Sequence, residues 1–212
     1  IMKLTELKEA VGSLSAPSKM PCSSYSIPAK ECNVGSRLVS VKGSTCNGCY
    51  ALKGMYRFPN VEKALYYRYN ALLKDTDLWE KNMTMYIDKF RKGDKDYFRW
   101  HDSGDVQNMN HLTAMNNIAL ALPHIQFWLP TREIKIVRLW QSLYQFAPNF
   151  IVRISAHMND AQPNYKITGY ASGVIDKSTD LKGRECPAPT QNNECGDCRA
   201  CWTEETVLYH KH

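Results

Sequence analysis

Eight cysteines occupy the two ends of this 212-residue chain, and none lies in the 136 residues from Tyr50 to Glu185. Thiols that only fill a core would not be expected to leave the middle of the chain empty, so the pattern predicts two ligand sets. The N-terminal four are Cys22, Cys32, Cys46 and Cys49, and the C-terminal four are Cys186, Cys195, Cys198 and Cys201.

The C-terminal four contain a tight triple, Cys195-Gly196-Asp197-Cys198-Arg199-Ala200-Cys201. Two successive two-residue spacings are typical of ferredoxin-type iron–sulfur ligation, with a fourth cysteine arriving from elsewhere, and Cys186 is the nearest candidate. A zinc site with four thiolates usually consists of two separated pairs, so zinc is the second interpretation. Disulfides or free thiols are the third.

The N-terminal four end in Cys46-Asn47-Gly48-Cys49, where Asn-Gly favours a tight turn between two ligands. Cys22 and Cys32 are more widely spaced. Both could complete a site with Cys46 and Cys49, or one of them could take no part. An iron–sulfur cluster is preferred over zinc here as well.

The middle of the chain alternates between helix and strand patterns. Helices are expected at 61–74, from a cap at 75–77 to Phe90, at 110–122 and at 133–146, and strands at 97–100, 125–129 and 149–154. Segment 37–41 is a candidate earlier strand and 169–175 a candidate later one. The strand spacing suits right-handed strand–helix–strand units in a parallel sheet.

The expected fold is therefore α/β, a partial or open parallel (β/α) barrel with cysteine-rich N- and C-terminal extensions packed against it. A flat doubly wound sheet is the alternative. A single domain is expected, with an N-terminal cysteine segment at 1–50, a strand–helix core at 51–176 and a C-terminal cysteine segment at 177–212. The five tryptophans are interpreted as core residues.

Polar residues follow each central strand, at the edge where parallel sheets place their chemistry. They comprise the segment from His101 to Asp105, then Arg132, then His157. His101, Asp105, Arg132 and His157 are the candidate catalytic residues. The plainer interpretation is that polar loops begin where strands end, and that a single Arg or His forms a cap or an ion pair.

Two family resemblances rest on these segments. Cys46-Asn47-Gly48-Cys49-Tyr50-Ala51 resembles the second half of the radical S-adenosylmethionine (SAM) cysteine motif, and Ser103-Gly104-Asp105 resembles the segment that holds the methionine amino group of S-adenosylmethionine there. The string 99–105, the segment 128–132 and the C-terminal triple together resemble the phage gene product 88 family. The radical SAM spacing needs a cysteine where this chain has Lys42, so Cys32 or Cys22 would supply the third ligand.

The radical SAM resemblance implies an iron–sulfur enzyme that uses S-adenosylmethionine, bound by Ser103, Gly104 and Asp105, and acts on a nucleotide or nucleic acid. One or two 4Fe–4S clusters are the expected cofactors, with zinc as the alternative. The competing hypothesis is a non-catalytic iron–sulfur or zinc protein that binds nucleic acid or a protein partner.

Net charge and hydropathy exclude few classes of binding partner. The formal net charge of +6 permits a nucleic-acid partner without requiring one. The sequence has no apolar run long enough to span a membrane and no apolar core typical of a signal peptide near its start. We therefore expect a cytoplasmic protein, in the host cytoplasm if the chain is phage-encoded, with no membrane partner.

Overall fold

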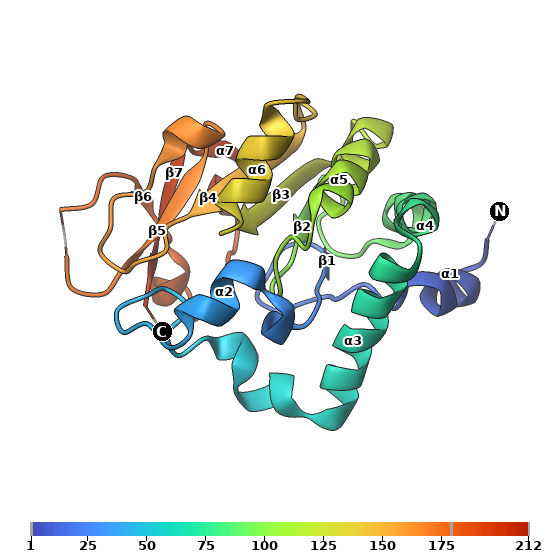
Figure 1. The fold of residues 1–212 in the computed structure, drawn as a ribbon, viewed down its shortest axis with the longest axis horizontal. Coiled ribbons are helices and arrows are strands. Elements are labelled where there is room, and N and C mark those ends of the chain that lie inside the picture. Colours follow the sequence, from blue (N-terminus) through green and yellow to red (C-terminus); the bar gives the residue numbers. More distant parts are fainter. Residues whose placement is uncertain (1, 179, 212) are drawn as a thin grey trace.

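The computed structural model of the chain describes residues 2–178 and 180–211 (Figure 1). Seven strands form one sheet, and every neighbouring pair is parallel. In spatial order they are β1 (Ser24–Tyr25), β2 (Tyr97–Trp100), β3 (Gln126–Thr131), β4 (Phe150–Ser155), β5 (Ala171–Ile175), β7 (Thr206–His210) and β6 (Arg184–Glu185). The two edge strands do not pair within the described residues, so the sheet is open. The α/β class and the parallel sheet are confirmed.

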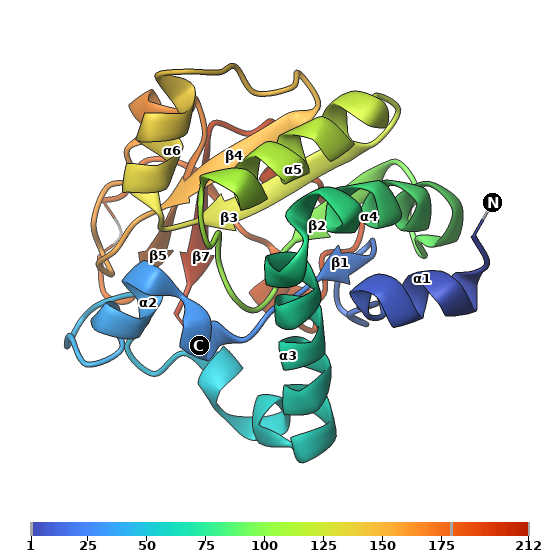
Figure 2. The ribbon, with the colours of Figure 1, turned by 45° about the vertical axis from the view of Figure 1, so that its right-hand side comes forward.

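Seven α-helices accompany the sheet in the described part of the chain. They are α1 (Leu4–Val11), α2 (Asn33–Leu38), α3 (Pro59–Lys74), α4 (Thr76–Phe90), α5 (Met109–Ala121), α6 (Ile134–Gln141) and α7 (Ala200–Thr203). Figure 2 shows α4, α5 and α6 on one face of the sheet, with α1 beside α4. Within the described residues, no helix has the length and apolarity needed to span a bilayer.

Local sequence signals explain where the central helices begin. The Asp75 carboxylate accepts a hydrogen bond from the Leu78 amide, and the Asn108 side chain accepts one from the His111 amide, so each caps the helix that follows it. Helix α6 ends at Gln141, earlier than expected. Beyond it, the exposed Leu143 and Tyr144 fold into a turn against the Trp140 carbonyl.

The strand expected at 37–41 is wrong. These residues form the end of α2 and a turn, and Val41 is exposed. The place beside β2 is taken by β1, in which Ser24 lies opposite Arg99. The strands at 97–100, 126–131, 150–155 and 171–175 confirm the other expectations.

The terminal cysteine segments also contribute to the sheet. The N-terminal segment supplies β1, and the C-terminal segment supplies β6 and β7. Both terminal segments therefore form part of the sheet as well as packing against it. This arrangement brings cysteines from both ends of the chain to the same sheet.

The two faces of the sheet differ in chemistry because side chains alternate along each strand. The helix-covered face carries Phe98, Trp100 and Phe127, which pack with Trp79 into the main core. The opposite face carries polar and amphipathic side chains, in register across neighbouring strands: Arg99 beside Trp128, and Pro130 beside Arg153. All five tryptophans are buried, as expected. The polar face is where the candidate site lies.

Candidate functional site

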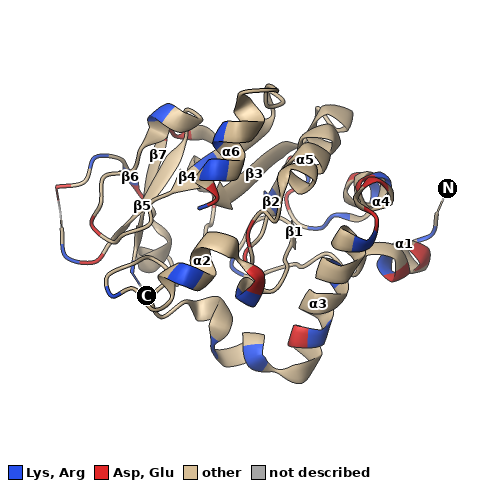
Figure 3. Cartoon of the chain, viewed as in Figure 1, with Lys and Arg blue, Asp and Glu red and all other residues tan. Residues whose placement is uncertain are grey.

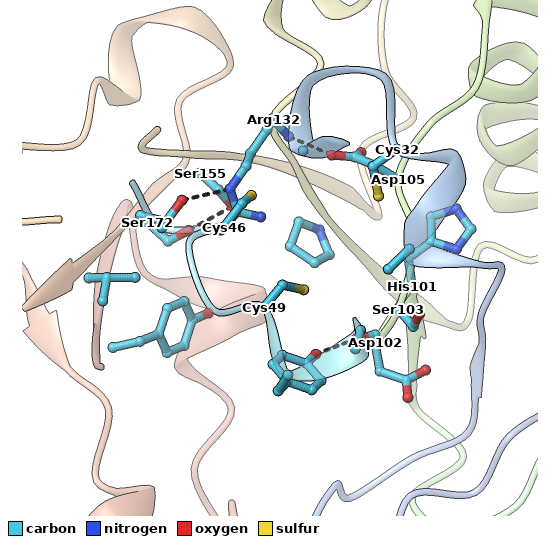
Figure 4. A pocket seen from close by; sticks show the side chains of 18 of the residues that line it. Cys32, Cys46, Cys49, His101, Asp102, Ser103, Asp105, Arg132, Ser155 and Ser172 are labelled. Carbon is cyan, nitrogen blue, oxygen red and sulfur yellow. Dashed lines mark hydrogen bonds between the residues drawn. The ribbon is translucent and has the colours of Figure 1, made fainter. Parts of the chain in front are cut away.

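A cavity of about 410 Å³ opens at the carboxyl ends of the strands (Figure 4). Residues from the ends of β2, β3, β4, β5 and β7 line it, together with both cysteine segments. Because the carboxyl ends of parallel strands meet at one edge, the topology brings together groups that are far apart in sequence. This volume suits a small molecule rather than a macromolecule.

Three cysteines of the N-terminal segment converge on this cavity. Cys32, Cys46 and Cys49 all line it, and Figure 4 shows their sulfurs directed toward the same space. We call them the three-cysteine set. Cys46 and Cys49 lie on a tight turn, in which the Cys49 amide donates to the Cys46 carbonyl at 3.0 Å and Gly48 has a φ of 79°.

A glycine leaves room between two of these thiols. A Cβ placed on Gly35 would lie 3.6 Å from the sulfurs of both Cys32 and Cys46 and 3.0 Å from the Cβ of Cys32. Any larger residue at this position of α2 would fill the space that the two sulfurs share. The local fold thus keeps the surroundings of the thiols clear.

The loop that carries the three-cysteine set is fixed to the strand ends. The Thr45 amide donates to the His157 carbonyl at 2.9 Å, and the Thr45 hydroxyl accepts from Arg132 Nε at 2.9 Å. The buried Glu133 carboxylate accepts the Val34 amide at the first turn of α2, at 2.8 Å. A carboxylate at this position satisfies a free amide at the start of the helix.

The other five cysteines form a second group, of which Cys186, Cys195 and Cys201 line the same cavity. Cys186, Cys195, Cys198 and Cys201 come from the C-terminal segment, and Cys22 joins them from the N-terminus. Cys22 is 3% exposed and packs with Trp128, Trp202 and Cys201, and the charge of Cys195 contributes to its raised pKa. We call these the five-cysteine set. The sequence left open whether Cys22 and Cys32 both accompany Cys46 and Cys49. In the structure Cys32 lines the cavity with them, whereas Cys22 packs with Cys201 of the C-terminal segment.

The five-cysteine set is fixed to the sheet by polar contacts. Arg199 forms an ion pair with Asp94 at 2.8 Å and donates to the Gly196 and Cys198 carbonyls. The Cys195 amide donates to the Lys19 carbonyl at 3.0 Å, which ties the tight loop to the N-terminal segment.

Arg153 of β4 is a further anchor of the C-terminal segment. Its side chain is fully buried, and its guanidinium donates to five carbonyl oxygens. The acceptors are Ala171, Ala200, Cys201, Glu204 and Glu205. Four of these acceptors lie in or next to α7, so one buried cation gathers the chain around Cys201.

Burial favours the protonated form of several of these thiols. It raises the pKa of Cys22 to about 12 and that of Cys201 to about 11, and it raises the pKa of Cys32 and Cys46 as well. Metal binding must therefore displace protons, which makes it dependent on pH.

The cysteine sets differ in fit for a single metal ion and for an iron–sulfur cluster. In the described residues, no three His, Cys, Asp or Glu side chains converge as ligands of a single metal ion. An iron–sulfur cluster is larger than a single ion and is held by thiolates spread around it. The three-cysteine set, directed into a shared space beside a glycine, provides suitable donors for such a group.

The segment after β2 forms hydrogen bonds with the chain at residues 25 and 27. His101 has a φ of 58°, is 3% exposed, and donates from Nδ1 to the Tyr25 carbonyl at 2.9 Å, while its buried Nε2 has no partner within the described residues. Burial lowers the pKa of His101 to about 4, so the ring is neutral at pH 7. The Ser103 hydroxyl donates to the Ile27 carbonyl at 3.0 Å, and Gly104, with a φ of 91°, also lies against Ile27.

Asp105 is the most heavily bonded of the expected site residues. It is 4% exposed, and its carboxylate accepts hydrogen bonds from the Val106 amide, the Thr131 hydroxyl and the Arg132 amide at 2.6–2.9 Å. Burial raises its pKa, and these three donors counteract part of the effect. Asp105 therefore joins the ends of β2 and β3 beside the three-cysteine set.

Arg132 and His157 are neighbours, as the strand-end argument expected. His157 Nε2 donates to the Arg132 carbonyl at 3.1 Å. Arg132 lines the cavity, and its charge counteracts the burial that raises the pKa of Cys46. His157 lies outside the cavity lining formed by the described residues, and it contacts the site through Arg132 and Thr45.

Sequence reasoning gave no individual role to several residues that line the cavity, among them Arg99 and Tyr209, and it named Asp102 only within the segment from His101 to Asp105. The Asp102 carboxylate accepts hydrogen bonds from the hydroxyls of Ser24, Ser26 and Tyr56. Arg99 could have been noticed, because it is the one charged residue in the aromatic strand Tyr97–Trp100 and falls on the face opposite Phe98.

Comparison with known proteins gives one match, to a family model. No curated protein and no solved structure matches the chain significantly. The family model described as gene product 88 matches residues 2–204, nearly the whole chain. The expected resemblance to this family is confirmed: the chain belongs to the gene product 88 family.

Proposed function

We propose that this protein is an iron–sulfur enzyme whose three-cysteine set holds a 4Fe–4S cluster with one iron open to the cavity. The observation that carries the proposal is the convergence of Cys32, Cys46 and Cys49 on one cavity at the carboxyl ends of the strands. Cys186, Cys195 and Cys201 line the same cavity but are assigned to the five-cysteine set in this proposal, which leaves three protein thiolates for four iron positions.

A cluster with three protein ligands supplies an iron that can bind a small molecule and pass an electron to it. S-adenosylmethionine is the candidate ligand, from the resemblance at Ser103-Gly104-Asp105. The Asp105 carboxylate has about four acceptor positions and uses three of them within the protein. One position remains for an amino group of a ligand.

The other candidate catalytic residues have supporting roles in this proposal. Arg132 places a positive charge beside Cys32 and Cys46, which favours their thiolate forms. His101 is neutral and its Nε2 can accept a proton or a hydrogen bond, whereas His157 positions Arg132 through its carbonyl. The hydrogen bonds of His101 Nδ1 and His157 Nε2 form in the protein without any bound group.

For the five-cysteine set we propose a second cluster, fully ligated by Cys186, Cys195, Cys198 and Cys201. Cys186, Cys195 and Cys201 line one cavity, and the charges of Cys186 and Cys198 add to the burial that raises the pKa of Cys195, which supports this assignment. Zinc remains the competing metal for this set. Cys22, which packs with Trp128 and Trp202 in a buried cluster, is the fifth thiol and needs no metal to be accommodated.

The substrate that this proposal favours is a small molecule, of nucleotide size or below. The cavity volume supports this, and Lys and Arg are interspersed with Asp and Glu along α1, α3 and α4 (Figure 3). A nucleic-acid partner would more typically meet a basic stripe.

The test begins with iron, acid-labile sulfide and zinc in anaerobically purified protein. We expect about eight irons per chain, and about four in each of two variants: Cys32, Cys46 and Cys49 changed to Ser, or the four C-terminal cysteines changed to Ser. Iron-free, zinc-containing wild-type protein would exclude the proposal.

Electron paramagnetic resonance then tests the open iron. S-adenosylmethionine should change the spectrum of the reduced cluster held by the three-cysteine set, in wild type and in the C-terminal variant alike. An unchanged spectrum in a protein that contains both clusters would favour the non-catalytic alternative, in which the clusters only stabilise the fold.

A further inference from the structure

Arg99 stands apart from the other arginines of the interior. Arg91, Arg153 and Arg199 each direct several N–H groups to backbone carbonyls, and Arg199 also pairs with Asp94. Arg68 likewise donates to two carbonyls. The fold thus satisfies its other buried guanidinium groups with its own oxygens.

The guanidinium of Arg99 has no such partners. Its single hydrogen bond within the described residues runs from Nη1 to the thioether of Met20, at 3.5 Å, and thioether sulfur is a weak acceptor. Its Nε is buried and unpartnered, and no ion pair is formed in the described part of the chain. A buried cation without an acceptor is costly unless an anion completes it.

The nearest carboxylate does not fill this role. Asp102 raises the pKa of Arg99 by its charge, after Tyr50, but its oxygens are engaged by the hydroxyls of Ser24, Ser26 and Tyr56. Within the described residues, Arg99 thus forms no ion pair with a carboxylate.

Arg99 lies at the cavity, where a bound ligand can meet its unpartnered N–H donors. It lies on the polar face of β2, lines the cavity, and its guanidinium carbon is 4.7 Å from the centre of the Trp128 ring. Stacking on an aromatic ring fixes the plane of a guanidinium while leaving its edge free. That edge presents a fork of N–H donors, which matches the paired oxygens of a carboxylate or a phosphate.

We propose that Arg99 binds an oxyanion, a carboxylate or phosphate group, of the small molecule that occupies the cavity. This deepens the proposed function, on which it rests in placing a small-molecule ligand in the same cavity. It defines the ligand class as anionic and gives Arg99, to which the sequence analysis assigned no role, the task of orienting the ligand.

The experiment is calorimetric titration of anaerobically purified protein with three probes: benzoate, inorganic phosphate, and benzamide as the neutral analogue of benzoate. We expect wild-type protein to bind at least one of the two anions and not benzamide. Arg99→Gln should weaken anion binding at least tenfold, and Arg99→Lys, which keeps the charge but not the fork, should weaken it less. Arg138→Gln, at an exposed position of α6, removes the same charge and should leave the affinity unchanged.

Benzoate binding without phosphate binding identifies a carboxylate site, and the reverse identifies a phosphate site. Wild-type protein that binds neither anion, or an Arg99→Gln variant with unchanged affinity, would overturn the proposal. If Arg99→Gln does not fold, Arg99→Lys decides, because full wild-type affinity in that variant would also contradict recognition by the fork.

Iron content, measured on the same samples, separates this inference from the proposed function. Anion binding that depends on Arg99 in an iron-free protein would support the anion site and reject the iron–sulfur enzyme. Loss of iron in Arg99→Gln with unchanged anion affinity would show that Arg99 serves only the five-cysteine set, which rejects the anion site.

Discussion

Replacing Arg153 by Met tests how the C-terminal cysteine segment is held to the sheet. Arg153 is fully buried and donates to five carbonyls, the shortest bonds being those to Glu204 at 2.6 Å and to Ala171 at 2.7 Å. Methionine has a similar length and is apolar, so the substitution removes the hydrogen bonds and retains much of the packing.

The magnitude follows from the two short bonds. A hydrogen bond to a charged group contributes about 1.5–3 kcal/mol, so the pair contributes about 3–6 kcal/mol. The variant no longer buries a guanidinium, which offsets part of this loss. We therefore expect Arg153→Met to lower the free energy of unfolding by about 4 kcal/mol.

Urea denaturation followed by circular dichroism measures this change, with Arg138→Met as the exposed control, expected within about 0.5 kcal/mol of wild type. Because four of the five acceptors lie in or next to α7, the loss should also be local. Under the proposed function, iron held by the five-cysteine set should fall before iron held by the three-cysteine set. A wild-type denaturation midpoint, or equal loss of iron from both sets, would refute this reasoning.

Three further substitutions have defined outcomes. The pKa of His101 is about 4 in the folded chain, against 6.5 for an ordinary histidine, so the unfolded chain takes up the proton first and stability is lost as pH falls from 6.5 toward 4. In denaturation midpoints measured against pH, His101→Asn should reduce this slope. An unchanged slope would argue against a role of His101 in this loss of stability. Gly35→Val should lower iron loading of the three-cysteine set because its Cβ would lie 3.6 Å from two sulfurs, whereas Ser36→Val, exposed on the same helix, should load normally. Gly104→Ala combines a φ of 91° with a collision against Ile27 and should lower the melting temperature through a loss of at least about 2 kcal/mol; a stable variant would show that the loop can move.

The local sequence determined most of the central architecture. Helical spacing of apolar residues and caps such as Asp75 placed α3, α4 and α5, and short aromatic or β-branched runs placed β2, β3 and β4. The strand spacing then predicted a parallel sheet, with polar strand ends at one edge. These features were predictable because hydrogen bonds and apolar periodicity within short segments dictate them.

The terminal segments were less predictable. Strand β1 has two residues and β6 also has two, too few to show a period, whereas the apolar residues at 37–41 imitated a strand. Whether such a segment joins a sheet depends on which edge is free, and β1 had taken the place beside β2. This is a property of the assembled sheet rather than of the segment.

The sequence alone located the eight cysteines in two terminal segments and predicted that polar groups would follow the central strands. Tertiary structure decided their grouping: Cys22 lies three residues before Tyr25 of β1, yet it packs with Trp202 near the other end of the chain. It also left Arg99 as the interior guanidinium without a carboxylate or carbonyl partner among the described residues. The physical reason is that ligand sets and charge pairs depend on distances through space, which the parallel order of the strands sets and spacing along the chain does not.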